Sequence, residues 1–183
     1  MHYNKIDIVF DHNKLLEEFN RLNLDDLLNK DPFQLAVQSR TNSKSQLYES
    51  CGSLIFDWQK YEQNPTGKMP LRTEKFKETD FTETCDLFKG TYIEYVIDAI
   101  KSKHNIVRGR FMKMMHKTCL TMHSDSSPRI HIPIYTNPGC MMIVNETIIH
   151  MPIGNAYYVD TTLPHTALNA SKKDRVHLVF CLT

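Results

Sequence analysis

Two histidines and one aspartate have the spacing of a metal site. His123 and Asp125 are separated by a single residue, and His165 follows His123 by 42 residues. In an extended segment, residues i and i+2 point to the same side, so the imidazole of His123 and the carboxylate of Asp125 would converge. Two histidines and one carboxylate form the facial triad of non-haem Fe(II), which leaves coordination positions open. A surface loop with a His–Asp hydrogen bond is the alternative explanation of this short motif.

An arginine that could bind an anion begins the last strand-like segment. In residues 175–180, Arg175 and His177 share one face, and apolar side chains share the other. A guanidinium inside a narrow barrel is costly unless an anion pairs with it, and a dicarboxylate that chelates a metal at its other end would supply that anion. On an edge strand, Arg175 would instead form a surface ion pair with Asp174 or Asp160.

Polar and apolar side chains alternate along residues 129–135. Three isoleucines form the apolar side, and Arg129, His131 and Tyr135 form the polar side. If the isoleucines pack outward against helices, the polar side lines the cavity of a barrel. If the isoleucines fill the interior, Arg129 and His131 are exposed to solvent. The alternation alone fits both arrangements.

Short β-type segments must position these side chains. They follow one another after residue 104 and are separated by Gly, Pro, Asn and Asp residues. The segments are 106–115, 118–122, 129–135, 140–144, 147–151, 156–159, 166–169 and 175–182. This spacing is typical of a β-sandwich or barrel, and eight such segments fit a jelly roll.

Helices are expected in the first hundred residues. Asp11 can cap a helix that extends to Leu22, and residues 23–35 indicate a second, short helix. A longer helix is predicted over residues 84–103, with an apolar stripe on one face. The stripe consists of Leu87, Tyr92, Tyr95, Val96 and Ile100. We expect these helices to cover the outside of a sheet.

Length and charge favour a globular protein without nucleic-acid or membrane partners. The 183 residues include 22 Lys or Arg and 21 Asp or Glu, so the net charge is +1 and gives no case for nucleic-acid binding. No apolar run approaches the roughly 18–20 residues of a membrane span, and the N-terminal residues do not resemble a signal peptide. The five cysteines contain no CxxC motif, so we expect reduced thiols in a cytoplasmic protein.

The C-terminal part of the chain differs in composition from the rest. Residues 101–183 contain 10 Lys or Arg, 4 Asp or Glu and seven of the nine histidines, so this part could attract small anions. We expect one domain over residues 1–183. Within it, residues 1–104 would form a helix-rich flanking region, and residues 105–183 would form the β core that carries the site.

The segment from Leu120 to Phe180 resembles the aspartyl/asparaginyl β-hydroxylase and cis-proline hydroxylase group of 2-oxoglutarate oxygenases. The matching pieces are residues 123–125, 129–134, 154–160, 163–169 and 175–179. They occur in the order of that family over about 60 residues, which is more specific than any one motif. The first hundred residues resemble small phage and bacterial members only loosely.

The resemblance implies a mainly β fold, with a double-stranded β-helix (jelly roll, cupin-like) core flanked by N-terminal helices. It also implies an Fe(II) site and the use of 2-oxoglutarate and O2. The implied metal ligands are His123, Asp125 and His165. Arg175 would bind the distal carboxylate of 2-oxoglutarate, and Arg129 and His131 would line the pocket of the co-substrate or substrate.

A second alignment of the metal ligands exists within this family. Some aspartyl hydroxylases lack the carboxylate ligand and take a metal histidine from the Arg-x-His strand. In that alignment His131 would be the ligand, and Pro133 would stand at the position of the missing carboxylate. We favour His123 and Asp125 because they complete a triad, as in the proline hydroxylase branch.

The expected function is that of a 2-oxoglutarate- and Fe(II)-dependent dioxygenase. It would hydroxylate an unactivated C–H bond of a small-molecule amino acid or of a peptide or protein side chain, with decarboxylation of 2-oxoglutarate to succinate. Contacts with the substrate are expected from Arg110, Arg129, Tyr135 and Tyr158. One rival hypothesis is a cupin-like metal enzyme that does not use 2-oxoglutarate and has no need of Arg175. The other is a non-catalytic β-helix binding module.

Overall fold

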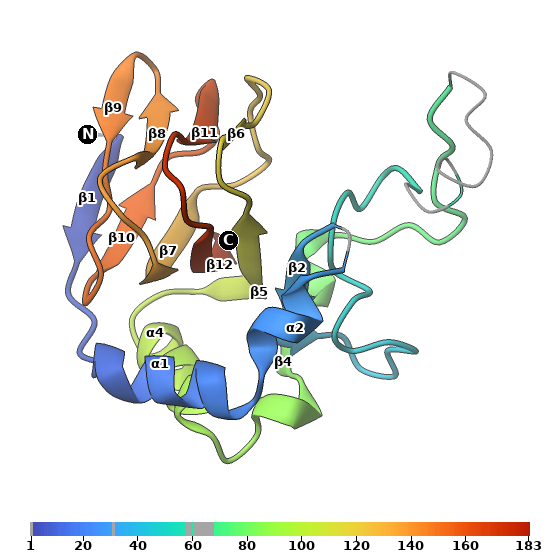
Figure 1. Cartoon of the computed structure of the whole chain (residues 1–183). Coiled ribbons are helices and arrows are strands. Elements are labelled where there is room, and N and C mark those ends of the chain that lie inside the picture. The colour runs from blue at the N-terminus through green and yellow to red at the C-terminus, as the bar shows by residue number, and fades with distance from the viewer. Residues whose placement is uncertain (1, 31, 58–59, 61–67) are drawn as a thin grey trace.

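Two β-sheets form the centre of the computed structural model, which describes residues 2–30, 32–57, 60 and 68–183 (Figure 1). The six-stranded sheet contains, in order, β1 (Tyr3–Ile6), β10 (Ala156–Val159), β7 (Arg129–Tyr135), β12 (Arg175–Leu182), β5 (Ile106–Met114) and β2 (Gln34–Ala36). The four-stranded sheet contains β6 (Thr118–Cys119), β11 (His165–Asn169), β8 (Cys140–Val144) and β9 (Thr147–Ile149). A separate pair joins β3 (Gln38–Ser39) and β4 (Glu83–Thr84).

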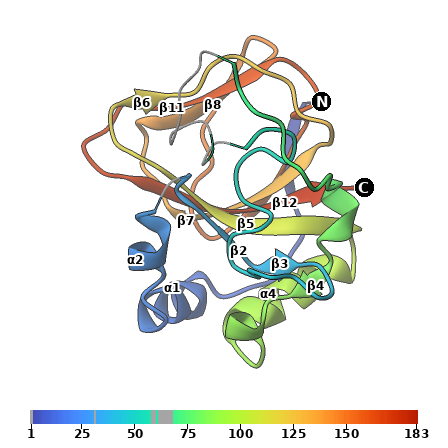
Figure 2. The same ribbon diagram turned by 90° about the vertical axis from the view of Figure 1, so that its right-hand side faces the viewer.

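The eight strands from β5 to β12 form a jelly roll. Along the chain, β5, β7, β10 and β12 lie in the six-stranded sheet, and β6, β8, β9 and β11 lie in the four-stranded sheet. Every pairing between them is antiparallel. The two sheets lie one above the other (Figure 2). The expected double-stranded β-helix is confirmed, and each of the eight predicted segments overlaps one of these strands.

Helices cover the outer face of the six-stranded sheet. They are α1 (His12–Arg21), α2 (Leu24–Leu28) and α4 (Tyr92–Lys101), and Figure 2 shows them on the side of this sheet away from the four-stranded one. Phe19 and Ile93 of the helices belong to one buried cluster with the three isoleucines of β7. The isoleucines therefore pack outward, so Arg129 and His131 face the space between the sheets.

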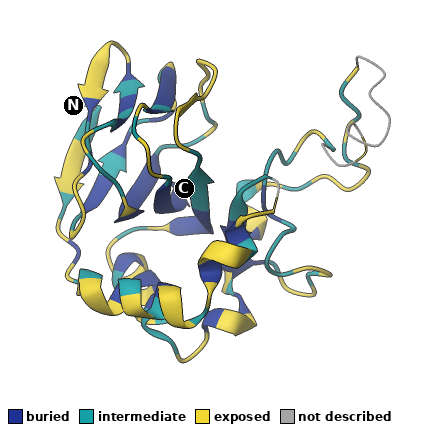
Figure 3. Ribbon diagram, in the orientation of Figure 1, coloured by how far each residue is buried: buried dark blue, intermediate teal, exposed yellow. Residues whose placement is uncertain are grey.

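The same alternation orients β12. Val176, Leu178 and Phe180 belong to the cluster under the helices, so Arg175 and His177 face the interior of the barrel. Figure 3 shows that β12 and β7 are almost entirely buried. The sheet thus has an apolar outer face and an inner face rich in arginine and histidine.

The helix predictions are partly correct. Asp11 caps α1 by accepting a hydrogen bond from the backbone of Asn13 (2.9 Å), as expected. The predicted helix over residues 84–103 is wrong at its start, because Gly90 has a φ of +73° and α4 begins after Thr91, which caps it. Residues before Gly90 form a short 3-10 helix, η2 (Asp86–Phe88).

Burial within α4 also differs from the prediction. The buried side chains are Ile93, Val96, Ile97 and Ile100. Tyr95, which the prediction placed in the apolar stripe, is 53% exposed. The helix predicted over residues 23–35 ends at Leu28. The chain then passes Phe33, at φ +57°, and enters β2, a strand that the sequence analysis missed together with β1, β3 and β4.

A β-bulge in β7 changes which side chains share a face. Val176 of β12 pairs with Tyr135, but His177 pairs with Pro133, so Ile134 is an extra residue. After the bulge, Tyr135 points toward the helices. The prediction that Tyr135 lies on the same side as Arg129 and His131 is therefore wrong.

Two further findings concern membrane helices and cysteines. Within the described residues, no helix combines the length and the apolar character that a membrane crossing needs. All five cysteines are free thiols, as predicted, and four of them are buried.

Candidate metal centre

His123 and His165 lie directly opposite each other on two antiparallel segments. The backbone N–H of His123 donates to the carbonyl of His165 (3.0 Å), and the N–H of His165 donates to the carbonyl of His123 (2.8 Å). Side chains at directly paired positions project to the same face. The two imidazole centroids are 4.3 Å apart. Backbone pairing thus brings together two residues that are distant in sequence.

Both imidazoles leave the same nitrogen free. Nδ1 of His123 lies 2.8 Å from the carbonyl oxygen of Thr121, and Nδ1 of His165 lies 3.0 Å from that of Leu163. A carbonyl oxygen only accepts hydrogen bonds, so each Nδ1 carries the proton and each Nε2 keeps its lone pair. Burial lowers the pKa of His165, which favours the neutral imidazole that a metal ligand needs.

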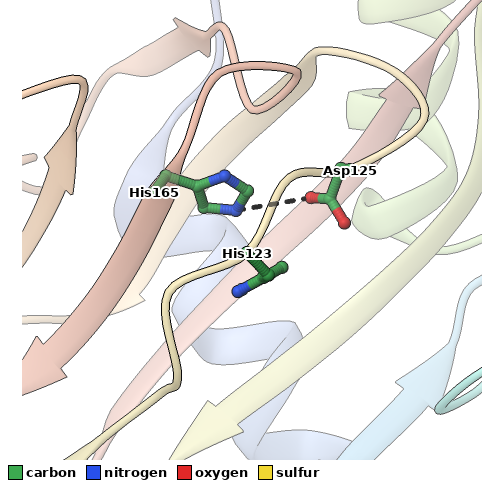
Figure 4. A group of neighbouring side chains, drawn as sticks. All are labelled: His123, Asp125 and His165. Carbon is green, nitrogen blue, oxygen red and sulfur yellow. Dashed lines mark ion pairs between the residues drawn. The ribbon is translucent and has the colours of Figure 1, made fainter.

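Asp125 enters the cluster from the loop that follows His123. Its backbone N–H donates to the carbonyl of Thr161 (2.8 Å). One carboxylate oxygen, Oδ1, pairs with Arg129 at 2.9 Å, and the other, Oδ2, lies 3.5 Å from Nε2 of His165. Figure 4 shows Asp125 and His123 on this loop and His165 on β11, gathered around one point.

The three side chains fit a mononuclear metal ion. Their ligand atoms all lie within 4.8 Å of one another, and across the described part of the chain no other group of His, Cys, Asp and Glu meets this criterion. His165 is buried, Asp125 is half-buried and His123 is exposed, so the cluster is open on the side of His123. Two imidazole nitrogens and one carboxylate oxygen suit Fe(II) and leave coordination positions open.

His131 is not part of this cluster. Its Nδ1 lies 3.4 Å from Nδ1 of His177, and its Nε2 has no hydrogen-bond partner among the residues that the structure describes. Burial lowers the pKa of His131, and the charges of Arg175, Arg129 and His165 lower it further. The geometry therefore favours His123 and Asp125 over His131 as metal ligands.

Arg175 is a buried cation without an acidic partner among the described residues. Its side chain contacts Sδ of Met114 (3.8 Å) and Nδ1 of His177 (3.2 Å), and its Nε has no partner at all. Burial lowers the pKa of Arg175 to about 10, so the guanidinium remains charged at neutral pH. A buried charge without a counter-ion is costly, so this position suits an anionic ligand.

The alternative of a surface ion pair for Arg175 is wrong. Asp174 pairs with Lys113 (3.4 Å) and His116 (2.9 Å) instead. Asp160 accepts hydrogen bonds from the backbone and hydroxyl of Thr162 and so caps the turn before β11. Neither carboxylate neutralises the arginine.

Arg110 is a second buried arginine on the inner face of the six-stranded sheet. It pairs across the sheet with Val179, and its Nη1 donates to Oε1 of Gln34 (3.0 Å). Its Nε is buried and has no hydrogen-bond partner in the described part of the chain. Burial, followed by the charge of Arg108, lowers the pKa of Arg110 to about 9.

Arg129 connects the cluster to a residue that the sequence analysis missed. Besides Asp125, it approaches Glu78 (3.4 Å) in the 3-10 helix η1 (Glu78–Asp80). Burial raises the pKa of Glu78, but Arg129 and hydrogen bonds from Ser127, Cys181 and Ser126 outweigh it and bring the pKa down to about 2. No motif marks Glu78. The only sequence signal is the surplus of Lys and Arg over Asp and Glu in residues 101–183. This surplus indicates that an acidic side chain from the first hundred residues pairs with one of these cations.

The two predicted tyrosines lie away from the barrel interior. Tyr135 packs edge-on against Phe19 and donates to Asn20 (2.9 Å) of α1. Tyr158 pairs with Ile130 and therefore shares its outward side, whereas the preceding tyrosine of β10 faces inward. The structure thus places neither Tyr135 nor Tyr158 with the other predicted site residues.

The fold and this cluster define the class: a double-stranded β-helix protein that carries a candidate metal site. A family model described as aspartyl/asparaginyl β-hydroxylase matches residues 13–183. The L-proline cis-4-hydroxylase of Rhizobium meliloti (strain 1021) is 33% identical over 76 residues, which are 38% of this chain and 27% of that protein. The matched stretch therefore spans about a quarter of that relative.

One solved structure resembles the whole chain in fold. It is a 2OG-Fe(II) oxygenase family oxidoreductase from Burkholderia pseudomallei, with a TM-score of 0.53 and 13% identity over 98% of this chain and 83% of that one. The chain belongs to the aspartyl/asparaginyl β-hydroxylase family.

Proposed function

We propose that the protein is a 2-oxoglutarate- and Fe(II)-dependent dioxygenase that hydroxylates an unactivated C–H bond of an amino acid or of a peptide side chain. One observation carries this proposal. A cluster of two histidines and one carboxylate shares the barrel with the buried Arg175, which has no acidic partner in the described chain. A metal enzyme that did not use a dicarboxylate would have no need of this unpaired cation.

The metal would be held by Nε2 of His123, Nε2 of His165 and the carboxylate of Asp125. The carbonyls of Thr121 and Leu163 keep the two imidazoles in the required tautomer. Fe(II) held there supplies, with 2-oxoglutarate and O2, the oxidation that replaces C–H by C–OH, while 2-oxoglutarate becomes succinate and CO2.

Arg175 would bind the distal carboxylate of 2-oxoglutarate. A guanidinium offers a planar fork that grips a carboxylate at two points, which fixes the direction in which the rest of the co-substrate extends. His131 and His177 lie beside it, and each has a buried Nε2 without a partner. These two nitrogens are available to hydrogen-bond the bound co-substrate.

For the substrate we propose a free amino acid, with Arg110 as the contact for its carboxylate. Arg110 is buried on the inner face with an unpartnered Nε, and within the described chain its side-chain hydrogen bonds go to neutral groups only. The similarity to an L-proline cis-4-hydroxylase supports an amino-acid substrate. Arg129 is occupied by two carboxylates, which argues for a positioning role instead of a substrate contact.

The test is an anaerobic titration of the metal-free protein with Fe(II) and 2-oxoglutarate. Chelation produces a visible metal-to-ligand charge-transfer band, which we expect in the wild type. Asp125→Ala should lose the band at Fe(II) concentrations that saturate the wild type, because the loss of one ligand weakens metal binding. Arg175→Ala should still bind Fe(II) but need at least about 10-fold more 2-oxoglutarate, since a charge-assisted pair is worth about 1.5–3 kcal/mol.

Arg21→Ala is the matched control, because Arg21 is an exposed arginine on α1. It should titrate like the wild type. Bound metal without a band in the wild type would refute the use of 2-oxoglutarate and favour the cupin-like rival. Folded protein without any metal binding would favour the non-catalytic module.

A further inference from the structure

Glu78 lies at the centre of a compact polar network around the metal-bearing loop. Its Oε2 accepts hydrogen bonds from the hydroxyls of Ser126 (2.9 Å) and Ser127 (2.8 Å). Its Oε1 faces Nη2 of Arg129 (3.4 Å) and accepts from Nη1 of Arg108 (3.0 Å). The carboxylate therefore contacts three of the four residues that follow Asp125.

Arg129 links Glu78 to the His123–Asp125–His165 cluster. The same Nη2 that faces Glu78 also pairs with Oδ1 of Asp125 at 2.9 Å. With Oδ1 engaged in this way, Oδ2 is the oxygen that turns toward His165. Without the carboxylate of Glu78, Arg129 would be free to draw both oxygens of Asp125 to itself.

The backbone conformation of Arg108 is a second, independent observation that supports a specific role for the network around Glu78. Arg108 has a φ of +52°, which is unfavourable for a residue with a side chain, and it lies in a bulge where Val179 pairs with Arg110 but Cys181 pairs with Val107. The bulge directs Arg108 to Glu78 and to the carbonyls of residues 50 and 52. The unfavourable backbone conformation of Arg108 thus brings its guanidinium into contact with the carboxylate of Glu78.

We propose that Glu78 is a positioning residue for the metal centre, acting through Arg129 and the Ser126–Ser127 turn to present Oδ2 of Asp125 beside His165. This inference rests on the proposed function in taking Asp125 as a metal ligand. It assigns a role in the site to a residue of η1, which lies in the region before the barrel. Outer residues that orient a ligand typically change metal affinity by about 10- to 100-fold.

The experiment titrates the metal-free protein with Co(II) and records its visible absorption, which reports both affinity and ligand geometry. Glu78→Gln keeps the shape of the side chain and removes its charge. We expect about 10- to 100-fold weaker Co(II) binding and an altered spectrum. Glu83→Gln, at an exposed glutamate on β4, is the matched control and should behave like the wild type.

The same substitution in the Asp125→Ala variant distinguishes a positioning role of Glu78 from a general effect on the fold. If Glu78 acts through Asp125, then Glu78→Gln should have little effect on the residual Co(II) affinity of Asp125→Ala. Equal losses in both backgrounds would refute the proposal, as would unchanged affinity and spectrum in Glu78→Gln alone. Should Glu78→Gln fail to fold, the double variant Ser126→Ala/Ser127→Ala removes two donors to Glu78, and we expect it to weaken Co(II) binding several-fold; unchanged binding would refute the proposal.

The controls also distinguish this inference from the proposed function. A wild-type protein that does not bind Co(II) would contradict the metal centre itself. Normal binding by the wild type, together with an unaffected Glu78→Gln variant, would contradict only the role of Glu78.

Discussion

His177 is a buried imidazole whose surroundings keep it neutral. Burial lowers its pKa well below the ordinary value, and the nearby charges of Arg175, His131 and His150 lower it further. The unfolded chain binds a proton at this residue as the pH falls below about 6.5, while the folded protein does not. Stability that is present above this pH is therefore lost as the solution becomes more acidic.

Urea unfolding of the metal-free protein at several pH values between 7.5 and 5 checks this expectation. We expect His177→Gln to lose less stability across this range than the wild type, with a difference in slope of up to about 1.4 kcal/mol per pH unit for one proton. Equal slopes in the wild type and His177→Gln would contradict a neutral, buried His177.

The residues of the candidate metal centre could be predicted from the sequence because local spacing encodes them. His123 and Asp125 share a side by strand geometry. His165 completes the facial triad, and Arg175 begins a strand-like segment as a candidate anion-binding residue. The family resemblance implied a specific role for each of them. Glu78 could not be found in this way, because its contacts depend on how residues from before the barrel fold over the loop. Tyr135 was misplaced because alternation alone does not reveal a bulge.

At the scale of the elements, β5 depends on a glycine at its bulge. A Cβ added to Gly109 would lie 2.4 Å from the ring of Phe180 and 2.7 Å from the side chain of Val37, so the backbone fits only without a side chain. Gly109→Ala should destabilise the protein by about 1–3 kcal/mol or more, as over-packed cores do. Thermal unfolding measures this change.

Gly154→Ala is the comparison for this variant. Gly154 also has a special backbone, with a φ of +81°, but a Cβ there would meet nothing within 4 Å. Its cost should be limited to backbone strain, about 1 kcal/mol. A smaller loss for Gly109→Ala than for Gly154→Ala would contradict the close packing of β5 against β12.

Strand positions were predictable where the sequence alternates strongly, and β7, β8, β10 and β12 have the predicted bounds. Short strands were missed, since β1 and β2 owe their pairing to β10 and β5 and carry little pattern of their own. The helix α4 begins later than predicted because Thr91 caps its N-terminus and Gly90, directly before it, has a positive φ that a helix does not accommodate. The apolar residues before Gly90 are therefore not part of this helix.

At the scale of the whole molecule, we propose that residues 1–104 and 105–183 fold as one domain. Buried side chains from both parts belong to one shared cluster, in which Leu15, Phe19 and Ile97 of the helices are joined by Ile132 and Leu178 of the barrel. Removing the helices would expose the apolar outer face of the six-stranded sheet.

This proposal predicts one cooperative unfolding transition. Far-ultraviolet circular dichroism, which follows the backbone, and tyrosine absorbance, which follows packing, should give the same midpoint in urea. A fragment of residues 105–183 should remain unfolded or aggregate. Two separate transitions, or a soluble fragment with native β-structure, would show that the barrel folds independently.

The charge of Arg175, which has no acidic partner in the described chain, has a consequence for the stability and the cellular amount of the protein. An anion that neutralises this arginine completes the interior, so folding and ligand supply become thermodynamically linked, by about 2.7 kcal/mol when the ligand is at 100 times its dissociation constant. Protein depleted of such an anion would open and be degraded more readily. Under the proposed function, the amount of protein in the cell, and not only its catalytic rate, would then follow the availability of the anion that binds Arg175.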